Sequence, residues 1–190
     1  MIAVKLNNLV GLKVAFDPIK VEKAYRSAIK KSAGKAKTQI SKKVRQTYNI
    51  KARDINAITR VNNITQGVVI TWIGSQLGLY KFTPLKRIIT LPKGTPWGNK
   101  RTGVSVRIKK SNKRKLVKTG FQVAKLNNQI FERNGEKMKS DPTKDAIKKM
   151  SGISIPQMVN DNILNEAARF MEKETPIQFE RAFNFFVGKK

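Results

Sequence analysis

The chain has 190 residues, 39% of them hydrophobic, which is enough to bury a core of its own, so we expect one domain over residues 1–190. Its 40 lysines and arginines against 12 acidic residues give a formal net charge of +28, and it contains neither cysteine nor histidine. This composition excludes disulfides, thiol nucleophiles and histidine-based catalytic or metal sites, and it favours a polyanionic partner, chiefly nucleic acid.

The positive charge is concentrated in the first two thirds of the chain. Residues 1–130 hold 29 basic and three acidic residues, whereas residues 131–190 hold 11 basic and nine acidic residues. Between Asp54 and Glu132 there is no carboxylate, so the basic groups of that stretch cannot neutralise one another locally. We therefore expect the two portions to face different surroundings.

Residues 1–60 are expected to be helical. Apolar side chains recur at spacings of three and four over residues 18–48, which predicts a long amphipathic helix. Asp17 and Pro18 suit the N-cap and the first position of this helix, and Asn49 is a plausible end. Residues 50–58 are expected to add a short second helix. The apolar positions are Val21, Tyr25, Ala28, Ile29, Ala33, Ala36, Ile40 and Val44.

Lysines lie between these apolar positions, and they allow two interpretations. They are either the solvated face of the helix, which we favour, or a strip that faces phosphates. The lysines concerned are Lys30, Lys31, Lys35, Lys42 and Lys43.

Residues 61–135 are expected to form a mainly antiparallel sheet, because the apolar period changes to two and β-branched and aromatic residues dominate. Trp72 alternates with Ile70 and is expected in the core. Trp97 lies in a breaker-rich loop, residues 91–100, and is a candidate for contact with a partner. The predicted strands cover residues 68–73, 79–82, 104–108, 116–123 and 129–132.

The basic hairpin, residues 107–115, lies between two of these strands and has Ser111 and Asn112 at its centre, as a turn would. It is either a finger that contacts DNA phosphates without reading sequence, or a solvated turn whose lysines protect strand edges from aggregation. We favour the first interpretation because acidic residues are absent around it. The residues expected to face DNA are Lys109, Lys110, Lys113, Arg114 and Lys115.

The C-terminal portion is expected to comprise a connector, residues 136–155, and a helical segment, residues 156–190, that is interrupted near Pro176. Ile155, Pro156 and Met158 stand at the junction between the two. We expect them either to anchor the last helix in the core or to contact another subunit or partner.

An enzyme is not expected. Carboxylate pairs remain, at residues 132 and 136, 141 and 145, and 172 and 174, but none has the spacing of a metal site, and no glycine-rich phosphate loop occurs. We therefore expect no catalytic residue, no cofactor and no metal. No run of 18 or more apolar residues occurs, and no membrane partner is expected.

Three stretches together resemble the minor tail protein Z family, the tail-completion proteins of long-tailed, lambda-like siphophages. They are YNIKARDI at residues 48–55, VKTGFQV at 117–123 followed by IFER at 130–133, and IKKMSGISIPQM at 147–158. Ile153 stands where the family has a proline, within its Gly-Pro-Ser segment that precedes Val-Pro or Ile-Pro. The resemblance covers most of the chain.

This resemblance implies a small α+β subunit of the virion, at the head-proximal end of the tail, with a long N-terminal helix, an antiparallel sheet and a C-terminal helix. The implied roles are tail maturation, head–tail joining and positioning of the DNA end. The implied partners are further copies of the chain in a ring, guessed as a hexamer, the tail terminator or tail tube, head-completion proteins, and viral DNA bound without sequence specificity. The main alternative is a basic nucleic-acid-binding protein that is not part of a virion, since charge alone fits it equally well.

Overall fold

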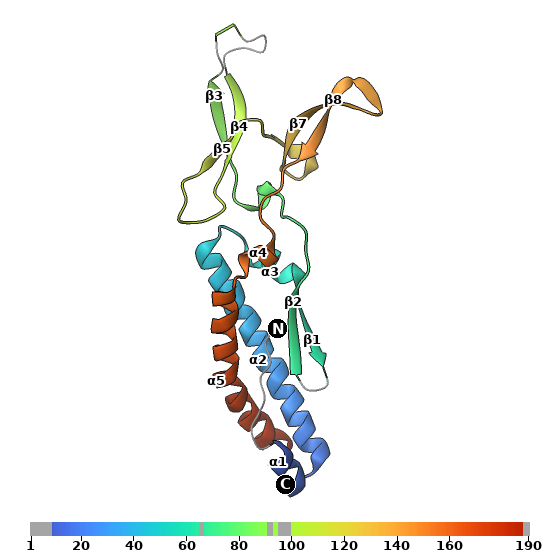
Figure 1. Ribbon diagram of the computed structural model, residues 1–190, viewed down its shortest axis with the longest axis vertical. Coiled ribbons are helices and arrows are strands. Elements are labelled where there is room, and N and C mark those ends of the chain that lie inside the picture. The colour runs from blue at the N-terminus through green and yellow to red at the C-terminus, as the bar shows by residue number, and fades with distance from the viewer. Residues whose placement is uncertain (1–8, 65–66, 91–92, 95–99, 188–190) are drawn as a thin grey trace. The chain divides into compact units, whose positions relative to one another are not determined.

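In the computed structural model, which describes residues 9–64, 67–90, 93–94 and 100–187, the longest element is helix α2, Pro18–Thr47 (Figure 1). The Asp17 carboxylate accepts a hydrogen bond from the backbone N–H of Ile19 at 2.9 Å, as an N-cap does, and Pro18 takes the first helical position. All eight apolar positions predicted from the spacing are buried. The long amphipathic helix is therefore confirmed.

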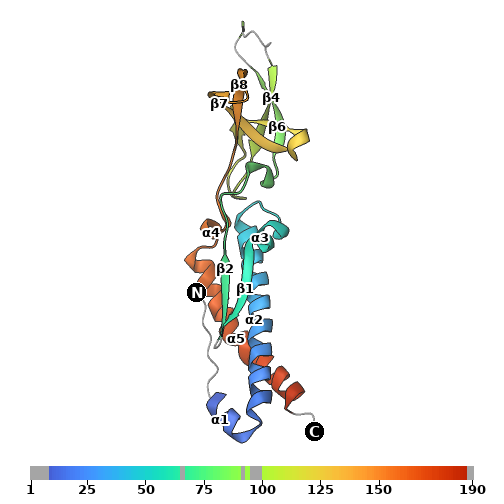
Figure 2. The ribbon, with the colours of Figure 1, turned by 90° about the vertical axis from the view of Figure 1, so that its right-hand side faces the viewer.

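Helix α5, Asp161–Phe186, and a hairpin of β1, Thr59–Ile64, and β2, Gly67–Trp72, both lie along α2 (Figures 1 and 2). On α5, Glu174 pairs with Lys35, and Glu166 pairs with Lys43 at 2.7 Å. On the hairpin side, Lys37 Nζ donates to the carbonyl of Thr59 at 3.2 Å. Polar contacts thus connect α2 to both neighbours around an apolar core.

The expected interruption at Pro176 is wrong, because α5 runs through this residue. Although proline removes one helical hydrogen bond, α5 buries Met171 and Ala182 on either side of it, and this packing keeps the helix continuous. The helical segment is interrupted before α5 instead. Helix α4, Ile155–Met158, is separate from α5, and the Asn160 side chain caps α5 by accepting a hydrogen bond from the N–H of Ile163 at 3.1 Å.

Two three-stranded antiparallel sheets account for most of the remaining chain. The first has the order β3, Leu85–Thr90, β4, Lys100–Val106, and β5, Lys115–Val117. The second has the order β6, Phe121–Val123, β7, Gln129–Met138, and β8, Asp141–Lys149. Helix α1, Leu9–Ala15, helix α3, Ala52–Ile58, and two single 3-10 turns, Leu79–Lys81 and Ala124–Leu126, complete the described elements.

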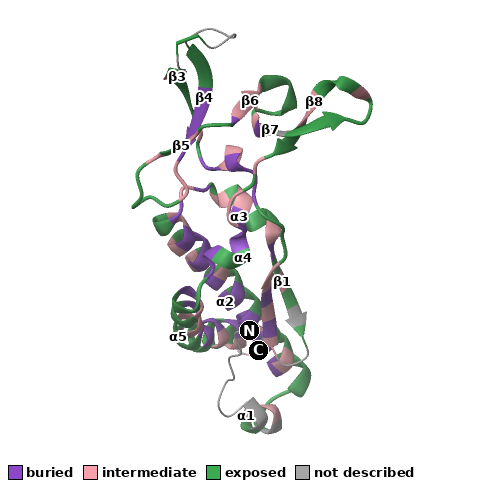
Figure 3. Cartoon of the chain, turned by 45° about the horizontal axis from the view of Figure 1, so that its top comes forward, coloured by how far each residue is buried: buried purple, intermediate pink, exposed green. Residues whose placement is uncertain are grey.

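Two expectations in this region are wrong. Residues 79–82 form a 3-10 turn and not a strand, because the buried Leu79 and Phe82 are three residues apart, the repeat of that helix. The connector expected at residues 136–155 is largely the end of β7 and the whole of β8, a mostly exposed strand (Figure 3). The predicted strand 116–123 is divided between β5 and β6.

The α+β class, with a long N-terminal helix, antiparallel sheets and a C-terminal helix, is confirmed. Contacts divide the chain into two compact units. Unit 1 comprises Met1–Val44, Ile55–Ile73 and Val159–Lys190, and unit 2 comprises Arg45–Asp54 and Gly74–Met158. Because each unit is assembled from separate segments, this division does not by itself define domains, and the single domain stays a prediction.

Candidate nucleic-acid interface

The basic hairpin lies in unit 2 and connects β4 to β5, which pair antiparallel from Val104 opposite Val117 to Val106 opposite Lys115. The segment that follows α2 holds it on its other side. The N–H of Asn49 donates to the carbonyl of Ile108, and the N–H of Lys110 donates to the carbonyl of Thr47, both at 2.8 Å. Backbone hydrogen bonds thus hold the predicted turn in place against the segment that follows α2.

The side chains of the basic hairpin divide into held and unpaired groups. The Arg114 guanidinium donates to the carbonyl of Thr83 at 2.7 Å, and Lys109 Nζ lies 5.9 Å from the centre of the Tyr48 ring. Lys110, Lys113 and Lys115 are exposed and, within the described residues, have no carboxylate partner. An external anion can therefore approach these three ammonium groups without breaking an ion pair.

Unit 2 as a whole is strongly positive, with 23 basic and five acidic residues. Its aspartates are already paired, Asp54 with Lys81 at 2.9 Å, Asp145 with Lys137 at 2.9 Å, and Asp141 with Lys144 at 2.6 Å. Hydrogen bonds from Lys137 and Lys144 are the main reason that the pKa values of Asp145 and Asp141, respectively, lie below the ordinary value. These carboxylates do not screen the basic hairpin.

A polar hollow of about 330 Å³ adjoins the basic hairpin within unit 2. A hydrogen bond connects the two, because the carbonyl of Thr83 in the hollow accepts from Arg114 of the basic hairpin. The Thr83 hydroxyl also accepts a hydrogen bond from the Asn49 side chain. The sequence indicated no site here, since its residues come from two separate segments. The polar hollow is lined by Lys51, Arg53, Asp54, Tyr80, Lys81, Thr83 and Pro84.

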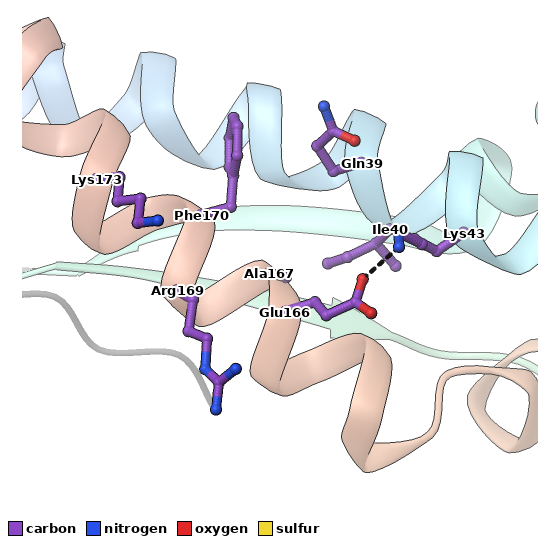
Figure 4. Close-up of a pocket in the computed structure, with 8 residues that line it drawn as sticks. All are labelled: Gln39, Ile40, Lys43, Glu166, Ala167, Arg169, Phe170 and Lys173. Atoms are coloured by element: carbon purple, nitrogen blue, oxygen red, sulfur yellow. Dashed lines mark ion pairs between the residues drawn. The ribbon is translucent and has the colours of Figure 1, made fainter.

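Unit 1 contains a second hollow, a groove of about 320 Å³ between α2 and α5 (Figure 4). Ile40, Ala167 and Phe170 supply its apolar lining, and Lys43 is paired with Glu166 beside it. Gln39, Arg169 and Lys173 complete the lining. This groove has the mixed apolar and charged character of a protein surface.

The residues expected to contact a partner fall into three classes. Trp97 lies outside the described residues. Ile155 and Met158 are fully buried inside the chain, so their side chains form core and are not available as a contact surface. Pro156 is exposed. The partner-contact role is therefore corrected for Ile155 and Met158, and the anchoring role is the one that their burial supports.

The lysines of α2 divide into paired and exposed groups, and both interpretations of this face stay predictions. Lys35 and Lys43 are paired with carboxylates of α5. Lys30, Lys31 and Lys42 are exposed and, among the described residues, have no ion-pair partner. Like the unpaired lysines of the basic hairpin, they are accessible to an anion.

Among the residues that the structure describes, no cluster of three or more acidic side chains could hold a metal ion. In the same residues, no helix has the length and apolar character needed to cross a membrane. A scan against protein-family models, a search of curated proteins and a search of solved structures each found no match to this chain. The resemblance to the minor tail protein Z family therefore stays a prediction.

Proposed function

We propose that the chain is a non-enzymatic structural subunit of a long-tailed phage, a tail-completion protein at the head-proximal end of the tail. In this proposal it takes part in tail maturation and head–tail joining, and it faces the packaged DNA with its basic hairpin. The family assignment rests on three stretches, which are residues 48–55, residues 117–123 followed by 130–133, and residues 147–158. The DNA contact rests on the residues of unit 2.

The observation that carries the DNA contact is the combination of fixed backbone and unpaired charge in the basic hairpin. Lys110, Lys113 and Lys115 are exposed, and backbone hydrogen bonds at Ile108 and Lys110 position the segment that bears them. Lysines on a turn supply charge and counterion release, whereas reading of bases needs side chains aimed at base edges in a groove. Such a surface binds DNA of any sequence, which suits a protein along which DNA must pass.

We further propose that copies of the chain assemble into a closed ring, with a hexamer as the working guess. Repulsion between subunits of net charge +28 opposes assembly at low salt, so contacts are expected from the less basic unit 1. Unit 1 carries 17 basic and seven acidic residues. A ring with head-to-tail contacts would match the rotational symmetry of a tail end.

Sedimentation tests the assembly. Analytical ultracentrifugation from low to high salt, with and without purified tail tubes, should show a ring that forms when charge is screened or when tubes are present. A monomer in every condition, tubes included, would rule out the tail-completion role. It would favour the alternative, a basic nucleic-acid-binding protein outside the virion, which the charge of unit 2 supports equally.

A further inference from the structure

The polar hollow of unit 2 has the side chains of an anion site. Of its charged lining residues, Lys81 and Asp54 form an ion pair at 2.9 Å, with only 25% and 14% of their side chains exposed. These two charges neutralise each other in the wall of the hollow. Lys51 and Arg53 are exposed and, within the described residues, have no carboxylate partner, so the hollow keeps two uncompensated positive charges.

The walls of the polar hollow are fixed by contacts outside it. A Cβ atom added to Gly78 would lie 2.7 Å from the Tyr80 ring, so the ring packs directly against this backbone. Lys149 Nζ lies 5.6 Å from the centre of the same ring. Thr83 has a positive φ of 44°, and its carbonyl is occupied by Arg114. The hollow is thus a shaped recess with fixed aromatic and backbone walls.

We infer that the polar hollow binds one phosphate group, held jointly by Lys51 and Arg53. A guanidinium matches two phosphate oxygens at once, and an ammonium adds a point charge to a third. Because Thr83 of the hollow accepts a hydrogen bond from Arg114 of the basic hairpin, we expect a phosphodiester bound there to belong to the same DNA backbone that the hairpin contacts. This inference rests on the proposed function for the DNA source of the phosphate, and free phosphate is the other source.

The test compares K51Q/R53Q with K139Q/K148Q, a control that removes the same charge from two exposed lysines of unit 2 outside the hollow. Titration with inorganic phosphate is followed by NMR at the backbone amides of Tyr80 and Thr83. We expect saturable shifts in the wild type and the control and their loss in K51Q/R53Q. Melting curves of all three proteins confirm that each is folded.

A salt series with a short DNA duplex identifies the source of the phosphate. If the two cations hold one phosphodiester, K51Q/R53Q reduces the slope of log affinity against log salt by about 0.9, the value for one phosphate. Saturation by inorganic phosphate with an unchanged DNA slope also supports the site and assigns it to free phosphate. A decrease of about 1.8 would place the cations on separate phosphates and overturn the joint site.

Shifts that stay linear in phosphate, or a K51Q/R53Q protein that behaves like K139Q/K148Q in both titrations, would also overturn the inference. Failure of the proposed function has a different signature. In that case the wild-type protein binds no duplex at any salt concentration, whether or not phosphate saturates the hollow.

Discussion

Replacing Met158 by alanine tests whether the segment before α5 is anchored in the core. Met158 is 0% exposed, and Ile155 of the same short helix is equally buried. Truncating a buried methionine removes apolar contacts and leaves a cavity, at a cost of about 2–5 kcal/mol. In a chain of this size each kcal/mol lowers the melting temperature by roughly 2–4 °C, so we expect a decrease of about 4–20 °C.

Met138→Ala is the matched control, because Met138 lies in the same unit but is 37% exposed. The control should change stability by no more than about 0.5 kcal/mol. Thermal unfolding followed by circular dichroism measures both variants under identical conditions. If Met158→Ala melts together with Met138→Ala, Met158 is not a core residue, and the partner-contact role would have to be reinstated.

Two further outcomes concern unit 1. Gly34 is exposed within α2, with nothing within 4 Å of an added Cβ, so Gly34→Ala should raise stability by about 1 kcal/mol in thermal unfolding. The hydrogen bond from Lys35 is the main reason that the pKa of Glu174 lies below its ordinary value. The ion pair therefore stabilises the folded protein at pH values above the pKa that Glu174 has in the unfolded chain. This stability is lost as the pH falls through the lower pKa of Glu174 in the folded protein. Glu174→Gln should therefore lose about 0.2–1 kcal/mol near pH 7 and show a shallower decline in acid than the wild type, whereas Glu172→Gln, an exposed neighbour, should follow the wild type.

The parts of the fold that local periodicity dictates were predictable. In α2 the apolar residues recur on one face, and the N-cap and first-position residues mark its start, so its bounds follow closely from sequence. Strands β2, β4 and β7 contain the β-branched and aromatic runs that were predicted as strands. Each of these signals is read within one segment and needs no tertiary partner.

The missed elements owe their conformation to pairing with distant residues. Strand β8 is rich in lysine, includes Pro142 and has no apolar alternation, yet it pairs with β7 from Phe131 opposite Lys149 to Met138 opposite Asp141. Strand β3 was missed as well. It is mostly exposed, with Ile88 facing solvent, so burial imposes no alternating apolar pattern on it. Propensity and pattern carry little information where an edge strand is stabilised mainly by its ladder.

The candidate site divides in the same way. The basic hairpin was visible as a charge run between two strand patterns, and its turn is where the pattern placed it. The polar hollow could not be predicted from the sequence, because Lys51 and Arg53 come close to Tyr80 and Lys81 only in the folded chain. Burial of Met158 also depends on tertiary packing, so the sequence left open whether this residue is a core anchor or a partner contact.

The central claim is that the basic hairpin contacts the DNA backbone, and a matched pair of charge variants tests it most directly. One variant replaces Lys109, Lys110, Lys113, Arg114 and Lys115 by glutamine. The other replaces five exposed lysines of α2 and lowers the net charge equally. The control positions are Lys20, Lys23, Lys30, Lys31 and Lys42.

DNA affinity is measured across a salt series for both variants and the wild type, after melting curves show that all three are folded. We predict that the hairpin variant reduces the slope of log affinity against log salt by up to about 0.9 for each phosphate that the hairpin no longer neutralises, equally for duplexes of different sequence. The α2 variant should keep a slope close to that of the wild type. Equal slopes for the hairpin variant and the wild type would contradict the claim and leave the basic hairpin as protection for a strand edge.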